Sequence, residues 1–111
     1  MSMIEQLEVL AGHKVAEAVH IHDYFQIIFD DAAILTILNP YRCEDSPGQP
    51  RDTKLLTETL LEQVLELDHK VLLEFSGGLR LSIDFSDEAF VGPEAMTLKR
   101  PGYPAVVWGI S

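Results

Sequence analysis

The feature that most constrains the fold of this chain is a pattern of apolar residues that occurs twice, 46 positions apart (71 − 25, for example). The first occurrence comprises Val15, Val19, Ile21, Phe25, Ile27, Phe29, Leu35 and Ile37. The second comprises Leu61, Leu65, Leu67, Val71, Leu73, Phe75, Leu81 and Ile83. Eight apolar positions in one register indicate a duplicated supersecondary unit. Each half is too short to close a core alone, so we expect one domain over residues 1–111.

The first unit, residues 3–38, reads as a helix followed by three strands. Apolar residues recur at helical spacing over residues 2–11, with Ser2 placed as an N-cap and Gly12 as a stop. From Val15 the apolar period changes to two, which predicts strands over residues 15–21, 25–29 and 33–38. In the first strand the alternation places Val15, Val19 and Ile21 on one face. The opposite face then carries Ala16, Ala18, His20 and His22.

The second unit, residues 53–85, is predicted to restate the first. Asp52 or Thr53 caps a short helix, and two patterns conflict after it. Helical spacing extends through residues 61–67, whereas the repeat requires a strand there, and we favour the strand. Two further strands flank Ser76–Gly78, a hairpin signal because glycine readily adopts positive φ.

Two segments lie outside the repeat. Residues 39–51 contain three prolines and a glycine without apolar periodicity, which predicts a linker between the units. Residues 95–110 alternate on either side of a proline- and glycine-containing turn, which predicts a C-terminal hairpin. The expected fold is therefore α+β: a mainly antiparallel sheet or half-barrel of six to eight strands, built from two repeated helix-plus-meander units and the C-terminal hairpin.

Charge and composition exclude several classes of function. Eighteen acidic residues against eight basic ones give a net charge of −10, and no basic stripe is present, so nucleic-acid binding is disfavoured. No apolar run approaches the roughly 20 residues that a membrane span requires. The first ten residues carry acids and no basic residue, unlike a signal peptide. Cys43 is the single cysteine, which fits a reducing compartment, and we expect a cytoplasmic protein.

The acidic residues suggest where a basic partner protein would bind. The stretch from Leu81 to Leu98 contains no Lys or Arg and holds a cluster of acids, and a further acidic pair lies in the predicted linker. Electrostatic steering speeds the encounter of such a surface with a basic protein. The expected partner-binding residues are Glu44, Asp45, Asp84, Asp87 and Glu88.

The two units differ on their second faces. In the second unit this face is polar apart from Leu72, whereas in the first unit it is apolar. The apolar positions are Tyr24, Ile28, Ile34 and Leu38. Such a face is covered either by a helix of the same chain or by another subunit. The second alternative predicts a homodimer through the first meander.

His20 and His22 are the sharpest chemical signal in the chain. Residues i and i+2 of a strand share a face, so both imidazoles can meet one metal ion, with Asp23 nearby. The fragment lacks the further acid and histidine of a metallo-hydrolase site, so solvent-facing strand histidines are the better account and a metal site is the less favoured alternative. No nucleophile–base pair or phosphate-binding glycine loop is present. We therefore expect neither catalysis nor a cofactor.

The chain resembles small bacterial families of unknown function, some of which are immunity proteins of polymorphic-toxin systems. The resemblance rests on Gly12-x-x-Val15, on the Phe29–Asp30 turn and on a repeat ending at Phe75-Ser-Gly-Gly-Leu79. It also includes the segment Pro93–Leu98 and the closing Val106–Trp108. The resemblance implies a cytoplasmic protein that binds and neutralises a cognate toxin, and it implies no catalytic residue.

Two functional hypotheses follow. The first is a non-enzymatic acidic protein-binding module, such as an immunity protein that occludes the basic active site of its toxin. The second is a small-ligand or metal-binding domain that uses the sheet cavity and the His20/His22 pair.

Overall fold

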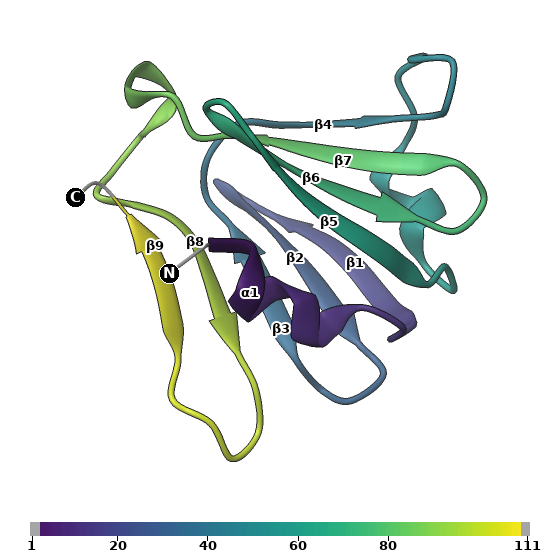
Figure 1. Ribbon diagram of the computed structural model, residues 1–111, viewed down its shortest axis with the longest axis horizontal. Coiled ribbons are helices and arrows are strands. Elements are labelled where there is room, and N and C mark those ends of the chain that lie inside the picture. Colours follow the sequence, from purple (N-terminus) through teal and green to yellow (C-terminus); the bar gives the residue numbers. More distant parts are fainter. Residues whose placement is uncertain (1–2, 110–111) are drawn as a thin grey trace.

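The computed structural model describes residues 3–109 and shows two antiparallel sheets (Figure 1). In the described residues the larger sheet has the strand order β1-β2-β3-β8-β9, and the smaller sheet has the order β4-β7-β6-β5. The helical segments, with η for 3-10 helices, are α1 (Met3–Leu7), η1 (Glu8–Leu10), η2 (Thr53–Leu56) and η3 (Asp87–Ala89). The strands are β1 (Val15–Ile21), β2 (Tyr24–Phe29), β3 (Ile34–Ile37), β4 (Tyr41–Glu44), β5 (Leu61–Leu67), β6 (Lys70–Phe75), β7 (Leu79–Asp84), β8 (Glu94–Lys99) and β9 (Val106–Gly109).

The sheet-dominated, antiparallel α+β class that the alternation predicts is confirmed. The expected single sheet or half-barrel of six to eight strands is corrected, because the described residues form nine strands divided between two sheets. The helix expected at the start of the second unit is corrected to a single 3-10 turn, η2, where the Asp52 carboxylate accepts a hydrogen bond from Lys54 N at 2.9 Å. The turn ends at Thr57, which is extended, and Glu58 then takes a φ of +74° before β5. The N-cap expected at Ser2 lies outside the described residues.

Residues 61–67 form a strand, β5, as the repeat requires. The predicted linker is corrected in part, because residues 41–44 form strand β4 at the edge of the four-stranded sheet. Pairing with β7 orders this short segment, with Tyr41 opposite Ile83 and Cys43 opposite Leu81. Cys43 is therefore buried in the core, and burial raises the pKa of its thiol.

The two sheets are joined where the segments before β1 and β5 pair with each other. Leu61 N donates to His13 O at 3.1 Å, and Val15 N donates to Thr59 O at 2.8 Å. Leu61 is equivalent to Val15 and His13 is equivalent to Thr59, each pair being 46 positions apart. The two bonds therefore join equivalent residues, with the donor and acceptor segments exchanged. Gly12 N to Leu61 O and Glu58 N to Val15 O form a second such couple, at 2.7 and 2.8 Å. The segments thus exchange equivalent bonds, and a common origin of the two units stays a prediction.

A β-bulge near the start of β1 corrects the predicted facing of that strand. The register shifts between Val15 and Glu17, so two residues of β1 oppose one step of β2. Val15 faces the core, but Val19 pairs with Gln26 and points outward, away from it. In β5 the register shifts at the equivalent place, between Leu61 and Gln63. An extra residue inverts all later side chains, and simple alternation does not reveal it.

The core lies between the two sheets. It contains three fully buried phenylalanines, Phe25, Phe29 and Phe75, with aliphatic residues from both sheets. Helix α1 lies beside β5 at the front of Figure 1, and Leu7 and Leu10 reach the core from α1 and η1. No helix among the described residues has the length and apolarity needed to cross a membrane.

Candidate functional site

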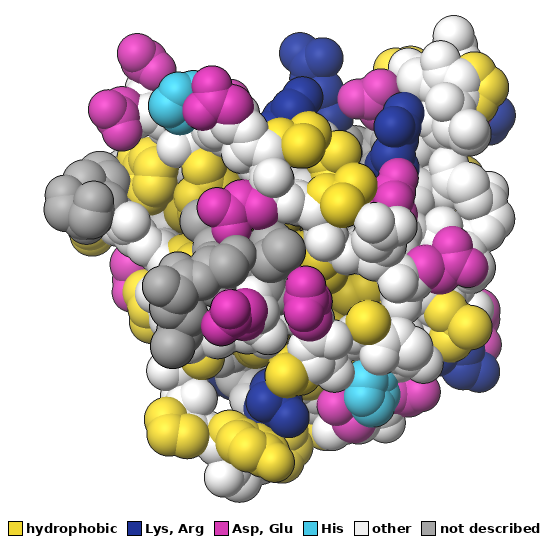
Figure 2. All heavy atoms as spheres, in the orientation of Figure 1, with side chains coloured by type: hydrophobic (Ala, Val, Ile, Leu, Met, Phe, Trp, Pro, Cys, Tyr) yellow, Lys and Arg dark blue, Asp and Glu magenta, His cyan; other side chains and the backbone are white. Residues whose placement is uncertain are grey.

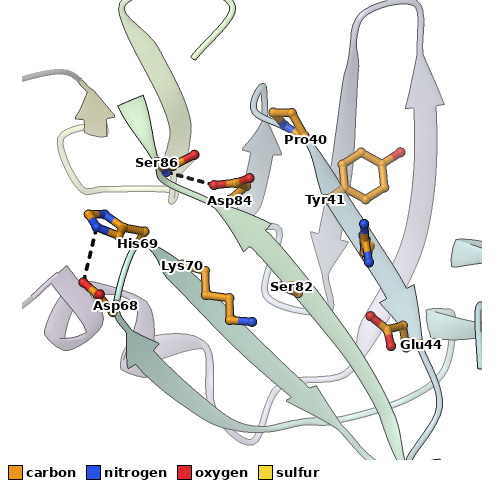
Figure 3. Close-up of a pocket in the computed structure, with 10 residues that line it drawn as sticks. Pro40, Tyr41, Glu44, Asp68, His69, Lys70, Ser82, Asp84 and Ser86 are labelled. Carbon is orange, nitrogen blue, oxygen red and sulfur yellow. Dashed lines mark hydrogen bonds and ion pairs between the residues drawn. The ribbon is translucent and has the colours of Figure 1, made fainter. Parts of the chain in front are cut away.

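The outer face of the four-stranded sheet carries a cleft of about 510 Å³ (Figure 3). Its lining residues, which we call the charged cleft, are Pro40, Tyr41, Arg42, Glu44, Asp68, His69, Lys70, Ser82, Asp84 and Ser86. They come from β4, from the turn between β5 and β6, from the start of β6 and from the end of β7. The site is thus assembled from three stretches of the chain, residues 40–44, 68–70 and 82–86, that the sheet brings together.

The strand register explains the hollow. Ser82 of β7 lies between Arg42 of β4 and Leu72 of β6, and all three side chains point outward. Because the serine side chain is shorter than its two neighbours, the surface is hollow above Ser82, and the charged side chains lie around this hollow. At the end of the sheet Lys70 lies opposite Asp84, so the rim carries charges of both signs. Figure 3 shows the Lys70 and Glu44 side chains on either side of Ser82.

The charges of the cleft are partly unused by the fold. Arg42, Glu44 and Lys70 form no ion pair within the described part of the chain, so their charged groups are available to a partner. His69 Nε2 lies 3.5 Å from Asp68 Oδ1, and both side chains are largely exposed. The surface therefore offers hydrogen-bond acceptors and donors side by side.

Asp84 is held in place by its own turn. Its Oδ1 accepts a hydrogen bond from Ser86 N at 2.9 Å, and this bond lowers the pKa of the carboxyl. Asn39, which is buried, donates from Nδ2 to the Asp84 carbonyl at 2.8 Å. These two bonds place a charged carboxylate at one end of the cleft.

The acids expected to bind a partner do not all lie at the charged cleft. Glu44 and Asp84 both line the charged cleft, and Asp87 and Glu88 follow Ser86 directly, exposed in η3. Asp45 instead closes its loop: its carboxylate accepts from Gln49 N at 2.9 Å and from Arg51 Nε at 2.8 Å. The bond from Gln49 lowers the pKa of Asp45 most strongly.

His20 and His22, the two histidines with metal-ligand spacing, lie in different local surroundings. His20 Nδ1 is hydrogen-bonded to the Tyr41 hydroxyl at 2.7 Å, and the Tyr41 ring stacks on Phe25 with 5.0 Å between centroids. Burial raises the pKa of Tyr41. His22 lies beyond the end of β1, in the turn, with a φ of +45°. The bulge has also turned the His20 position toward the core side of β1.

A group of metal-ligating side chains that the sequence analysis did not identify lies at the opposite end of β1. His13 Nδ1 is 2.9 Å from Asp30 Oδ1, and His13 Nε2 is 3.6 Å from Asp31 Oδ2. Among the described residues this is the one group of three such ligands within 4.8 Å of one another. The signal was available, because antiparallel pairing of β1 and β2 brings the residue before one strand to those after the other.

Helix α1 and the β8–β9 hairpin border a second, more apolar hollow, also of about 510 Å³. Arg100 lies 4.0 Å above the Tyr103 ring at this place, and Tyr103 is 61% exposed. Figure 2 shows this side of the molecule, with hydrophobic side chains near the tip of the hairpin and acidic side chains spread over the rest.

The predicted homodimer residues lie on the outer face of the five-stranded sheet. Ile28 of β2 is directly opposite Ile34 of β3, and both are half-buried. Tyr24, the first residue of β2, and Leu38, which follows the last residue of β3, are half-buried as well. The helical segments α1 and η1 pack against β5 of the other sheet, and η2 packs against β1.

Comparison with protein-family models, with curated proteins and with solved structures gave no match to this chain.

Proposed function

We propose that this chain is a non-enzymatic protein-binding module that docks a basic partner protein at the charged cleft. The observation that carries the proposal is the convergence of Glu44 and Asp84, from distant parts of the chain, on one cleft beside unpaired Arg42 and Lys70. Carboxylates in such a place accept hydrogen bonds from lysine and arginine side chains of a partner. The two bases receive acidic groups from the same partner.

Charge on the scale of the molecule supports this assignment. A net charge of −10 attracts a basic protein over distances comparable to the Debye length, about 8 Å at physiological salt. Asp87 and Glu88 extend the acidic rim beyond Asp84. Binding at this rim is expected to depend on salt mainly through the association rate.

The finer assignment is an immunity protein that occludes the active site of a cognate toxin. It is supported by the sequence resemblance and by the acidic balance, since a nuclease or other basic toxin would present a complementary surface. Glu44 and Asp84 would then contact the basic active-site rim, while Arg42 and Lys70 pair with acidic residues of the toxin.

The test compares two triple variants with equal change of charge. Glu44→Gln and Asp84→Asn remove two acids that line the charged cleft, and Glu88→Gln removes one from the adjoining η3. The amide oxygen that replaces the Asp84 carboxylate can still accept the bond from Ser86 N. The control variant carries Glu5→Gln, Asp23→Asn and Glu62→Gln, all at exposed positions away from the cleft. The tagged wild-type chain is used to capture a stoichiometric basic protein from native lysate, and its affinity is then measured.

We expect the cleft variant to bind the captured protein at least about tenfold more weakly, and the control variant to bind within about twofold of wild type. Equal weakening by both variants would show that only net charge matters, and would exclude the cleft as the binding site. Failure of the chain to retain any stoichiometric partner at low salt would overturn the binding-module proposal.

A further inference from the structure

The outer faces of the two sheets carry different kinds of residue at equivalent strand positions. Positions 46 apart occupy equivalent places in the β2–β3 and β6–β7 pairings, since Phe25 opposes Ile37 just as Val71 opposes Ile83. At four equivalent outward positions the residue of the second unit is charged and that of the first unit is apolar. These pairs are Tyr24 and Lys70, Ile28 and Glu74, Ile34 and Arg80, and Leu38 and Asp84.

The bulge in β1 enlarges the apolar face. Because side chains after the bulge are inverted, Val19 and Ile21 point to the same side as Gln26 and Tyr24, their partners on β2. At the other edge of the sheet Val107 of β9, which is 52% exposed, lies opposite Thr97. We call this outer surface of β1, β2, β3, β8 and β9 the apolar face.

One row of the apolar face carries a charge at each end. The row crosses four strands through directly paired positions: Glu17, Ile28, Ile34 and Lys99. Glu17 and Lys99 are exposed, and neither forms an ion pair within the described residues. The row is therefore acidic at its β1 end, apolar in the middle and basic at its β8 end.

Such a row is complementary to itself. If a second copy is related by a twofold axis that runs parallel to the strands, midway between β2 and β3, its row is reversed. Glu17 then faces Lys99 of the second copy, Lys99 faces Glu17 of that copy, and Ile28 meets Ile34. A twofold interface uses one patch on both subunits, which this arrangement satisfies. The pairs also cancel each other's charge, so the face adds no repulsion between two molecules of net charge −10.

We propose that the apolar face binds a second copy of this chain, face to face, with Glu17 paired to Lys99 of the other copy across the twofold axis. A second copy is favoured over an unrelated protein because the order of charges along this row is complementary to the same row in the reversed direction. The charged cleft lies on the other sheet, so this self-association is independent of the proposed partner binding.

The size of the face sets the expected affinity. Five strands spaced about 4.8 Å apart, each with about six residues of about 3.3 Å, outline a surface of roughly 400 Å² per copy. Specific interfaces of standard size bury about 800 Å² per partner. We therefore expect a dissociation constant in the micromolar range, and the measurement must extend to about 1 mM protein.

The test is sedimentation of the full chain over a range of concentrations. Wild type is expected to pass from a monomer of 12.4 kDa to a dimer of twice that mass. Ile28→Asp, which buries a charge in the interface but leaves the core untouched, is expected to remain monomeric throughout. Leu72→Asp is the matched control on the other sheet, also at an outward, half-buried position, and is expected to dimerise like wild type.

Charge exchange tests the twofold register itself. Glu17→Lys and Lys99→Glu are each expected to weaken dimerisation about tenfold, because each places like charges together at two sites per dimer. The double exchange restores opposite charges at both sites and is expected to recover wild-type affinity. Gln63→Lys, at the position equivalent to Glu17 on the other sheet, is the control and should change little.

Three outcomes would overturn the proposal: a monomeric wild type at about 1 mM, unchanged dimerisation of Ile28→Asp, or no recovery in the double exchange. The exchange experiment changes only the exposed residues Glu17 and Lys99, so it decides the matter even if Ile28→Asp does not fold.

Discussion

At the scale of single residues, Asn39 links the two sheets through a buried hydrogen bond. It follows β3 of the five-stranded sheet, is 2% exposed, and donates to the Asp84 carbonyl at the end of β7 in the four-stranded sheet. Replacing its amide by a carboxyl removes the donor and buries a group that can ionise. Burial raises the pKa of a carboxyl, so the cost is smallest below the unfolded-state value of about 3.9 and grows as the pH rises through it.

We therefore expect Asn39→Asp to lower the free energy of unfolding by about 2–3 kcal/mol at pH 7 and by clearly less at pH 3.5. Urea unfolding at the two pH values measures this, and Gln49→Glu is the control, an amide-to-acid change in an exposed loop. A cost that does not depend on pH would show that the introduced carboxyl reaches solvent.

At the scale of elements, the turns that lead into β1 and β5 share one backbone conformation but not one residue. Gly12 has a φ of +88° and Glu58, its equivalent, a φ of +74°. The left-handed conformation suits glycine and costs about 1 kcal/mol or more for other residues. A Cβ at Gly12 would meet no atom within 4 Å, so a substitution there acts through the backbone alone.

The expected results of exchanging these residues have opposite signs. Gly12→Ala should lower the free energy of unfolding by about 1 kcal/mol, and Glu58→Gly should raise it by up to about 1 kcal/mol. The exposed Lys14–Glu58 ion pair at 3.1 Å contributes little, so its loss does not reverse the second change. Chemical denaturation measures both. Stabilisation by Gly12→Ala would contradict the assigned turn.

At the scale of the whole molecule, the carboxyl groups of three described residues make the free energy of unfolding depend on pH in the acidic range. The pKa of Asp30 is lowered mainly by the hydrogen bond from His13, that of Asp45 by the bond from Gln49 N and that of Asp84 by the bond from Ser86 N. A folded-state pKa below the unfolded value contributes stability that is present above the unfolded pKa and is lost as the pH falls through the folded one.

The urea midpoint is therefore expected to fall as the pH drops below about 4. Asp45→Asn should flatten this decline, because it removes one of the three linked groups. Asp87→Asn removes the same charge from an exposed position in η3 and serves as the control. An identical decline in wild type and Asp45→Asn would contradict the role given to the Asp45 hydrogen bonds.

The sequence by itself determined most of the segments that become strands, β4 excepted, and that their pairing is mainly antiparallel. Apolar alternation and glycine-rich turns are local signals, and they place β2, β3, β6 and β7 close to their observed bounds. The 46-residue repeat also identified β5 against a competing helical pattern, because equivalent residues must make equivalent contacts.

Only the tertiary structure decided how these strands share two sheets. β4 has too short a pattern to be recognised alone and exists through its pairing with β7. The bulge after Val15 reverses the facing of Val19, because one inserted residue changes the parity of the strand. The charged cleft likewise requires three distant segments, and the apolar row requires the pairing of β3 with β8. Such long-range pairings depend on the whole chain, and no local pattern contains them.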